Sequence, residues 1–229
     1  MIEIDVHGER FLFSPEHNQE ISNFNWFIDY FRTGEWEKFT YEVFEKSSRN
    51  DKMALDIGAW IGATSIWLSK NFKEVYSFEP DPVAFEALRE NLKCNDCKNV
   101  LPIDKALYNE KTKLGFGVNP QFAHEGLGAS TSQLKTSNSE FEVQTTTFRE
   151  LSKMIPFGEV SFVKVDIEGA EEYIVEDLFK YAAIHKWDVL IEIHPDFMSQ
   201  QGLYDFNLTI QKYQPEVTEF GNQKFFRFS

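Results

Sequence analysis

The stretch KMALDIGAWIG at residues 52–62 decides the fold, because it joins an apolar run to a turn that contains two glycines. The run at 52–57 has the length and composition of a buried strand, and a helix is expected from Gly62 to about Lys70. Glycines at the end of a strand let the backbone pass close beneath a ligand. The stretch therefore predicts a strand–turn–helix unit with a binding site at its turn.

Short apolar runs alternate with helical patterns along the rest of the chain, which is typical of an α/β fold with a mostly parallel central sheet and helices on both faces. Asp81 and Pro82 supply an N-cap and a first helical residue, so a helix is expected after them. From Glu216, apolar and polar residues alternate across a Gly221-Asn222 turn, which predicts a C-terminal antiparallel hairpin. Other core strands are expected at 74–79, 99–104, 160–167 and 187–193, with a helix over 168–183.

The segments KLGFGV at 113–118 and FEVQTTTF at 141–148 indicate extra strands. Between them lies a polar loop at about 119–139, which is long enough for a functional role. A loop that closes over a ligand would use its polar side chains, which include His124, Ser130, Thr131 and Ser132.

Length and composition bound the organisation of the chain. Its 229 residues are 42% hydrophobic and 16% aromatic, which suffices for one sizeable core without disulfides or metal. Residues 1–50 are predicted to form an N-terminal extension of strands and helices that caps the sheet, and residues 51–229 the main domain, within one globular unit. Cys94 and Cys97 are expected to be ordinary reduced thiols, because no second ligand pair accompanies them.

The charge balance limits the class of partner. The chain carries 23 Lys and Arg against 37 Asp and Glu, a net charge of −14. Nucleic-acid binding depends on neutralisation of phosphates by Lys and Arg, so no nucleic-acid partner is expected. No stretch approaches the ~20 apolar residues of a membrane span, and the N-terminus is acidic where a signal peptide is basic and then apolar. A cytoplasmic protein is expected, and its oligomeric state stays open.

The spacing of the glycines argues against one cofactor class. A nicotinamide dinucleotide fingerprint requires glycine two and five residues after Gly58, and the chain has Trp60 and Ala63 there. The second strand ends at Glu79, before Pro80, and such a carboxylate can accept hydrogen bonds from two ribose hydroxyls. A nucleotide-sugar or nicotinamide-dependent enzyme is the rival interpretation.

Charged residues also follow two later strands. Alternation along VSFVKVDIEG places Lys164, Asp166 and Glu168 on one side, although a central parallel strand should be apolar on both faces. Glu192 and His194 end the next strand. In open α/β sheets, charges at these positions usually face the ligand crevice outside the carboxyl ends of the strands. The structural alternative pairs Lys164 with a carboxylate and makes Glu168 a helix cap.

The chain resembles the FkbM methyltransferase family in five blocks that occur in that family's order: LDIGAWIGATS (55–65), YSFEPDP (76–82), KALYNEKTKLGF (105–116), FVKVDIEGAE (162–171) and VLIEIHP (189–195). The resemblance implies a Rossmann-like methyltransferase fold, S-adenosylmethionine as cofactor and methyl transfer to oxygen. We therefore expect an O-methyltransferase acting on a hydroxyl of a sugar, glycan or glycolipid. A different small-molecule acceptor, such as a polyketide hydroxyl or an amine, and a non-catalytic binding domain are the alternatives. Trp60 departs from the small or polar residue, such as asparagine, that the family more often has.

These expectations give each cofactor residue a role. Asp104, at the end of the third strand, is expected to accept a hydrogen bond from the adenine amino group. Glu37 is expected to reach the amino-acid end of the cofactor, with a solvated helix residue as the alternative. The remaining predicted cofactor residues surround the first two strand ends: Asp56, Gly58, Ala59, Trp60, Gly62, Glu79 and Pro80.

Methyl transfer to a hydroxyl needs a proton acceptor or a metal, because a hydroxyl is a poor nucleophile until its proton leaves. His194 is the predicted base, since imidazole titrates near neutral pH, and Asp166 or Glu168 is the rival. Lys164 completes the predicted catalytic set. Asp166 and Glu192 are also predicted to hold Mg²⁺, which would orient the acceptor and lower its hydroxyl pKa. The alternative is that both carboxylates bond sugar hydroxyls directly.

Overall fold

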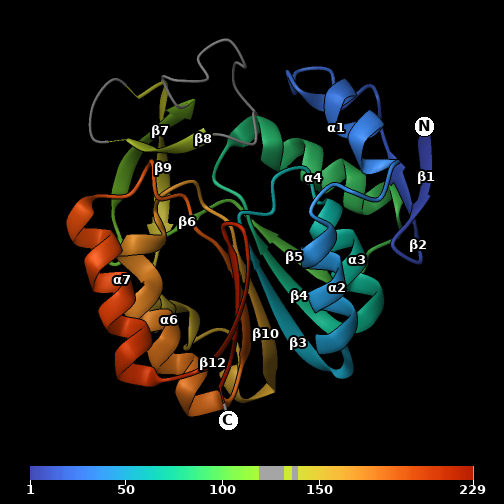
Figure 1. The fold of residues 1–229 in the computed structure, drawn as a ribbon. Helices are drawn as coiled ribbons and strands as arrows, with labels where there is room; N and C mark the ends of the chain where they lie inside the picture. Colours follow the sequence, from blue (N-terminus) through green and yellow to red (C-terminus); the bar gives the residue numbers. More distant parts are fainter. Residues whose placement is uncertain (119–131, 136–138, 229) are drawn as a thin grey trace.

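The computed structural model describes residues 1–118, 132–135 and 139–228, and within them a seven-stranded sheet forms the centre (Figure 1). The strand order is β12-β13-β11-β10-β3-β4-β5, and β13 runs antiparallel to both neighbours while the strands from β11 to β5 are parallel. This confirms the predicted α/β fold with a C-terminal hairpin. The strands are β3 (Arg49–Ile57), β4 (Phe72–Phe78), β5 (Val100–Ile103), β10 (Val160–Val165), β11 (Asp188–Glu192), β12 (Glu216–Phe220) and β13 (Gln223–Arg227).

Helices cover both faces of this sheet (Figure 1). Neighbouring residues of one strand belong to different hydrophobic clusters, as Phe162 and Val163 do, because successive side chains point to opposite faces. One cluster contains residues of α2 (Lys38–Ser47), α3 (Ala63–Asn71) and α4 (Pro82–Cys94). The other contains residues of α5 (Phe148–Leu151), the 3₁₀ helix η2 (Phe157–Glu159), α6 (Glu171–His185) and α7 (Gln200–Tyr213).

On the face of the sheet that α2, α3 and α4 cover, the same alternation buries polar residues near the carboxyl ends of the strands. Lys164 of β10 pairs in register with Asp56 of β3, and Asp56 pairs with Ser77 of β4. All three side chains are buried. Buried polar groups are costly unless they bond one another, so this edge of the sheet needs a network.

The N-terminal segment packs into the first cluster. β1 (Ile2–Val6) and β2 (Glu9–Phe13) form an antiparallel pair, and α1 (Phe24–Phe31) follows. The Phe13 ring meets Phe27 edge-on with centroids 5.6 Å apart, as befits aromatic pairs. The predicted strands and helices of this extension thus share one core with α3 and α4.

A second, smaller sheet has the order β6-β9-β7-β8, from β6 (Ala106–Leu107), β7 (Lys113–Val118), β8 (Ser132–Lys135) and β9 (Phe141–Thr146). The extra strands predicted near 113–118 and 141–148 are therefore confirmed. β9 ends two residues early, because Thr147 accepts a hydrogen bond from the Glu150 amide and caps α5. Of the predicted loop residues, Ser132 opens β8, whereas His124, Ser130 and Thr131 lie outside the described residues.

The helix predicted from residue 168 begins later, at Glu171. Glu168 and Gly169 have φ of 54° and 98°, left-handed values that a helix does not accommodate. The two residues form a turn that places Glu168 beyond the end of β10. None of the helices in the described ranges is both long and apolar enough to cross a membrane.

Candidate active site

A pocket of about 250 Å³ lies beyond the carboxyl ends of β3, β4 and β10, where the sequence predicts a ligand. Residues from the first two strand ends line it, namely Gly58, Ala59, Trp60, Glu79 and Pro80. Charged residues form a second group: Glu37, Lys164, Asp166, Glu168, Glu192 and His194. Aromatic and apolar side chains complete the lining, among them Trp26, Trp36, Phe116 and Leu134. The strand ends therefore gather most of the predicted site residues around one cavity.

The turn after β3 requires glycine for two reasons. Gly58 has φ 83°, and a Cβ there would lie 1.7 Å from the carbonyl oxygen of Asp166. Gly62 has φ 94°, and its Cβ would lie 2.6 Å from Cδ1 of Leu88. The first glycine lets β10 approach the turn, and the second lets α4 approach it. Gly62 is not among the residues that line the pocket, so it shapes the turn from behind.

Trp60 also has a left-handed backbone, with φ 47°. Among non-glycine residues, asparagine adopts this region more readily than a bulky residue such as tryptophan. The Trp60 ring meets Phe27 of α1 edge-on, with centroids 5.0 Å apart. Aromatic packing against the N-terminal segment thus offsets an unfavourable backbone conformation.

Glu79 connects the ends of β3 and β4. Its Oε2 accepts a hydrogen bond from the Trp60 amide at 2.8 Å, and its Oε1 accepts one from the Asp81 amide at 2.8 Å. The side chain is 6% exposed, and burial raises the pKa of Glu79 to about 8. Both oxygens retain lone pairs for further donors from the pocket.

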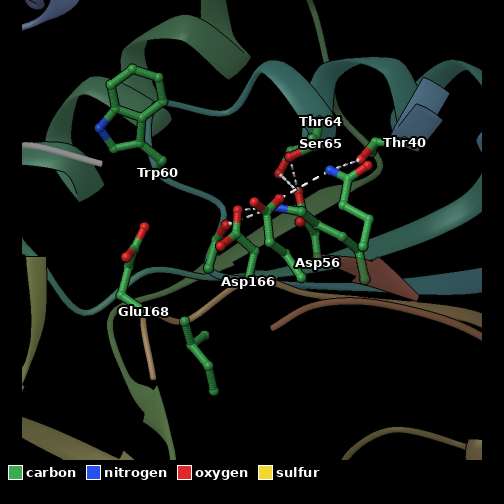
Figure 2. Close-up of polar contacts among 12 residues, drawn as sticks. Thr40, Asp56, Trp60, Thr64, Ser65, Asp166 and Glu168 are labelled. Atoms are coloured by element: carbon green, nitrogen blue, oxygen red, sulfur yellow. Dashed lines mark hydrogen bonds and ion pairs between the residues drawn. The ribbon is translucent and has the colours of Figure 1, made fainter. Parts of the chain in front are cut away.

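Asp56 lies beneath the turn and does not line the pocket. Its fully buried carboxylate accepts hydrogen bonds at Oδ2 from Thr64 at 2.8 Å and Ser65 at 2.6 Å. Figure 2 shows these bonds as dashed lines, with Glu168 standing apart from them. Burial raises the pKa of Asp56. Within the described residues, Asp56 bonds the first turn of α3, so its role is to support the glycine turn rather than to line the pocket.

Lys164 is the buried cation of the polar layer. Its ammonium lies 3.2 Å from Oδ2 of Asp166 and 3.3 Å from the Gly58 carbonyl oxygen. Burial alone would lower the pKa of Lys164, but the carboxylates of Asp166, Glu37 and Asp56 outweigh it and raise that pKa. Burial would likewise raise the pKa of Asp166, yet Lys164 and His194 hold it below its usual value. Lys164 therefore stays charged and neutralises the acidic end of the pocket.

Two further carboxylates flank this lysine. Oxygens of Glu37, Asp166 and Glu192 lie within 4.8 Å of one another, so the predicted pair Asp166 and Glu192 does come together. Glu37 stands at the N-cap position of α2 in a left-handed conformation, without a side-chain capping bond. Thr40 hydrogen-bonds its carboxyl group, whereas its buried Oε2 has no hydrogen-bond partner within the described residues. Burial raises the pKa of Glu37 to about 8. Glu192 accepts a hydrogen bond from Gln223 at 3.0 Å.

His194 forms the centre of a second charged group. Its Nδ1 lies 3.1 Å from Oε1 of Glu171, and its Nε2 lies 3.7 Å from Oδ1 of Asp166 and 3.6 Å from Oε1 of Glu168. Burial alone would lower the pKa of His194, but the Glu171 hydrogen bond and the charges of Asp166 and Glu168 raise it to about 10. In this arrangement the imidazole is protonated at neutral pH and has no free lone pair. Burial raises the pKa of Glu168 to about 8.

Glu171 has no role assigned from the sequence, although it belongs to the FVKVDIEGAE block. It is 1% exposed, and its carboxylate also accepts hydrogen bonds from the Ile167 amide at 3.1 Å and the Gly169 amide at 3.0 Å. Asp104, by contrast, is exposed after β5 and is not among the pocket residues.

Comparison with known proteins identifies the family of this chain. The family model described as Methyltransferase FkbM domain matches residues 56–224. The crystal structure of methyltransferase FkbM from Methylobacillus flagellatus KT aligns with a TM-score of 0.52 and 14% identity, covering 93% of this chain and 57% of that one. This chain therefore spans little more than half the length of that structure. No match was found among curated proteins.

Two further solved structures share the fold. A protein from Streptococcus mutans in complex with SAH aligns with a TM-score of 0.50 at 11% identity, covering 83% of this chain and 97% of that one. An rRNA methylase from Streptococcus thermophilus aligns with a TM-score of 0.50 at 8% identity, covering 84% and 96%. Such low identities establish the fold alone, whereas the domain match covers most of the sequence. The chain belongs to the FkbM methyltransferase family.

Proposed function

We propose that this chain is an S-adenosylmethionine-dependent O-methyltransferase that acts on a hydroxyl of a sugar, glycan or glycolipid. One observation carries the proposal. A single pocket joins a glycine turn and an oriented carboxylate, Glu79, to a group of carboxylates with one imidazole. The first part suits a nucleoside cofactor, and the second suits a polar acceptor.

The cofactor end is supported by the chemistry of S-adenosylmethionine. Its ribose carries two hydroxyls that Glu79 can bond, and its methionine carries an ammonium group. Glu37 is the carboxylate proposed for that ammonium, because its Oε2 is buried without a partner in the described part of the chain. A buried carboxyl oxygen without a hydrogen-bond donor is costly, and a cationic ligand would remove that cost.

The acceptor end would position a hydroxyl in line with the sulfonium methyl group. The acceptor oxygen forms a bond to the methyl carbon, the carbon–sulfur bond breaks, and its electron pair stays on sulfur to give the neutral thioether. The hydroxyl proton passes to a carboxylate. We assign that proton to Glu168, because a base with a pKa near 8 is matched to neutral pH, whereas His194 is already protonated.

A sugar acceptor is favoured by the mixed lining. Carboxylates accept hydrogen bonds from hydroxyls, and the rings of Trp26 and Trp36 offer apolar surfaces for a sugar face. Nucleic acid is disfavoured by the net charge of −14 and by the acidic pocket, although an rRNA methylase shares the fold. A polyketide hydroxyl or an amine remains the alternative acceptor.

We place the protein in the cytoplasm, in keeping with its free Cys94 and Cys97.

The predicted magnesium ion between Asp166 and Glu192 is not part of this proposal. The ammonium group of Lys164 already contacts Asp166 and interacts with Glu192, so it supplies the positive charge that this position needs.

Calorimetric titration with S-adenosylmethionine and with SAH tests the cofactor. We expect micromolar binding that Glu79→Ala weakens at least tenfold. Glu86→Gln, an exposed acid paired with Arg89 on α4, is the matched control and should bind normally. Absence of binding by folded wild-type protein would refute the proposal. A labelled methyl group transferred to oligosaccharides but not to RNA would then support the acceptor class, and the reverse result would overturn it.

A further inference from the structure

The imidazole of His194 faces two carboxylates at ion-pair distance rather than at hydrogen-bond distance. Its Nε2 lies 3.7 Å from Asp166 Oδ1 and 3.6 Å from Glu168 Oε1, beyond the usual range of 2.7–3.2 Å for such bonds. The three side chains come from the ends of β10 and β11 and can each offer one ligand atom within 4.8 Å of the others.

The other side of the ring shows how His194 is oriented. Glu171 receives two backbone N–H groups and accepts from Nδ1 of His194, which fixes the proton on that nitrogen. Nε2 is then directed at Asp166 and Glu168, and a bound cation would displace the Nε2 proton and take up its lone pair. Histidine ligands of metals nearly always donate their second ring N–H to a carboxylate or carbonyl in this way.

We propose that Asp166, Glu168 and His194 bind one divalent cation of the first transition row, such as Mn²⁺. Two ligand atoms about 2.1 Å from one ion lie about 3.0 to 3.4 Å apart in octahedral or tetrahedral geometry, so small side-chain movements would close the site. One nitrogen and two carboxylate oxygens suit such an ion, whereas Mg²⁺ prefers oxygen ligands alone.

The neighbouring trio of Glu37, Asp166 and Glu192 is a weaker candidate, although its oxygens are equally close. Lys164 lies against Asp166 Oδ2 and already provides a cation on that side. Asp166 thus divides its two oxygens, with Oδ2 toward the lysine and Oδ1 toward His194. The ion belongs on the Oδ1 side.

The role of the ion rests on the proposed function, but its binding does not. Three protein ligands leave positions open for the acceptor hydroxyl, whose oxygen the cation would hold and whose pKa it would lower. With the ion bound, Glu168 would be a ligand, so Glu192, which lines the same pocket, would replace Glu168 as the acceptor of the hydroxyl proton.

The test is a Mn²⁺ titration of untagged protein of residues 1–229, treated with EDTA and free of S-adenosylmethionine, followed by electron paramagnetic resonance. We expect one site, with ¹⁴N coupling from an imidazole ligand. Glu168→Gln should weaken binding at least tenfold. Glu171→Gln should weaken it about tenfold or more by releasing the ring of His194. Glu192→Gln, the matched control, should bind Mn²⁺ as the wild type does.

Three results would overturn the site: no stoichiometric Mn²⁺ binding by folded protein, binding without nitrogen coupling, or binding lost in Glu192→Gln and kept in Glu168→Gln. Binding of S-adenosylmethionine, measured separately on the same samples, distinguishes failure of the ion site from failure of the proposed function.

Discussion

The backbone amide of Trp60 donates a hydrogen bond to Oε2 of Glu79 at 2.8 Å, which joins the turn after β3 to the end of β4. The Asp81 amide holds the other carboxylate oxygen at the same distance. The backbone therefore fixes the orientation of this carboxylate without any ligand. A fixed acceptor loses little entropy when it binds two ribose hydroxyls.

The raised pKa of Glu79 predicts that cofactor affinity depends on pH. Ribose hydroxyls bond the ionised carboxylate best, and Glu79 keeps its proton up to about pH 8. Below that pH, binding must first remove the proton, so affinity should fall by up to about tenfold per pH unit. Calorimetry with SAH from pH 6 to 9 measures this slope. Glu79→Gln should reduce it, and Glu37, whose pKa burial also raises to about 8, should account for the rest. A slope unchanged in the variant would assign the whole effect to another group.

The same pKa affects stability with a defined sign. The unfolded chain releases the Glu79 proton near pH 4.5, whereas the folded protein keeps it to about pH 8. Between these values the unfolded state binds fewer protons, so the free energy of unfolding falls as pH rises. Urea denaturation at pH 5 and pH 8 should show a smaller loss in Glu79→Gln than in the wild type. An equal loss in both proteins would contradict the assignment.

Periodicity and glycine spacing were enough to predict the sheet and the strand ends that carry the site. An apolar run such as KMALDI indicates a buried strand, and charged residues at strand ends indicate a ligand crevice. Gly58, Glu79, Asp166 and His194 all line the predicted pocket.

Sequence patterns could not predict the contacts that depend on tertiary packing. Glu171 resembles any acid in a first helical turn, and only the turn at Glu168 and Gly169 brings two backbone amides onto its carboxylate. Trp26 and Trp36 reach the pocket only because the N-terminal segment packs onto α3 and α4. Asp104, which follows β5, is exposed and does not line the pocket, although its neighbour Lys105 does.

Gly58→Ala should destabilise the protein far more than an alanine at another left-handed glycine. The new Cβ would clash with the Asp166 carbonyl oxygen at 1.7 Å, besides adopting an unfavourable φ. We expect a loss of about 3 kcal/mol in the free energy of unfolding. Gly221→Ala is the matched control, because its φ is 58° but nothing lies within 4 Å of its Cβ, and it should cost about 1 kcal/mol. Equal losses would show that the clash relaxes freely.

Glu171→Ala should leave two backbone amides and His194 without their acceptor. Each buried donor without a partner costs about 1–3 kcal/mol, so a total loss of about 3 kcal/mol is expected in chemical denaturation. Glu171→Gln keeps one acceptor oxygen and should lose less. Asp177→Ala, on the exposed side of the same helix, should stay within about 0.5 kcal/mol of the wild type. A neutral Glu171→Ala would mean that water replaces the carboxylate.

Lys164→Met should remove the cation on which the acidic layer depends. Asp166 loses its direct partner, and the charges of Glu37 and Asp56 lose the cation that offsets them. Removing one member of a buried ion pair costs about 3–5 kcal/mol, because the other charge stays desolvated. The double variant Lys164→Met/Asp166→Asn should recover part of that loss, and a double-mutant cycle measures the coupling. Lys73→Met, which breaks an exposed pair with Glu159, should be close to neutral. Additive effects of the two buried substitutions would contradict the pairing of Lys164 with Asp166.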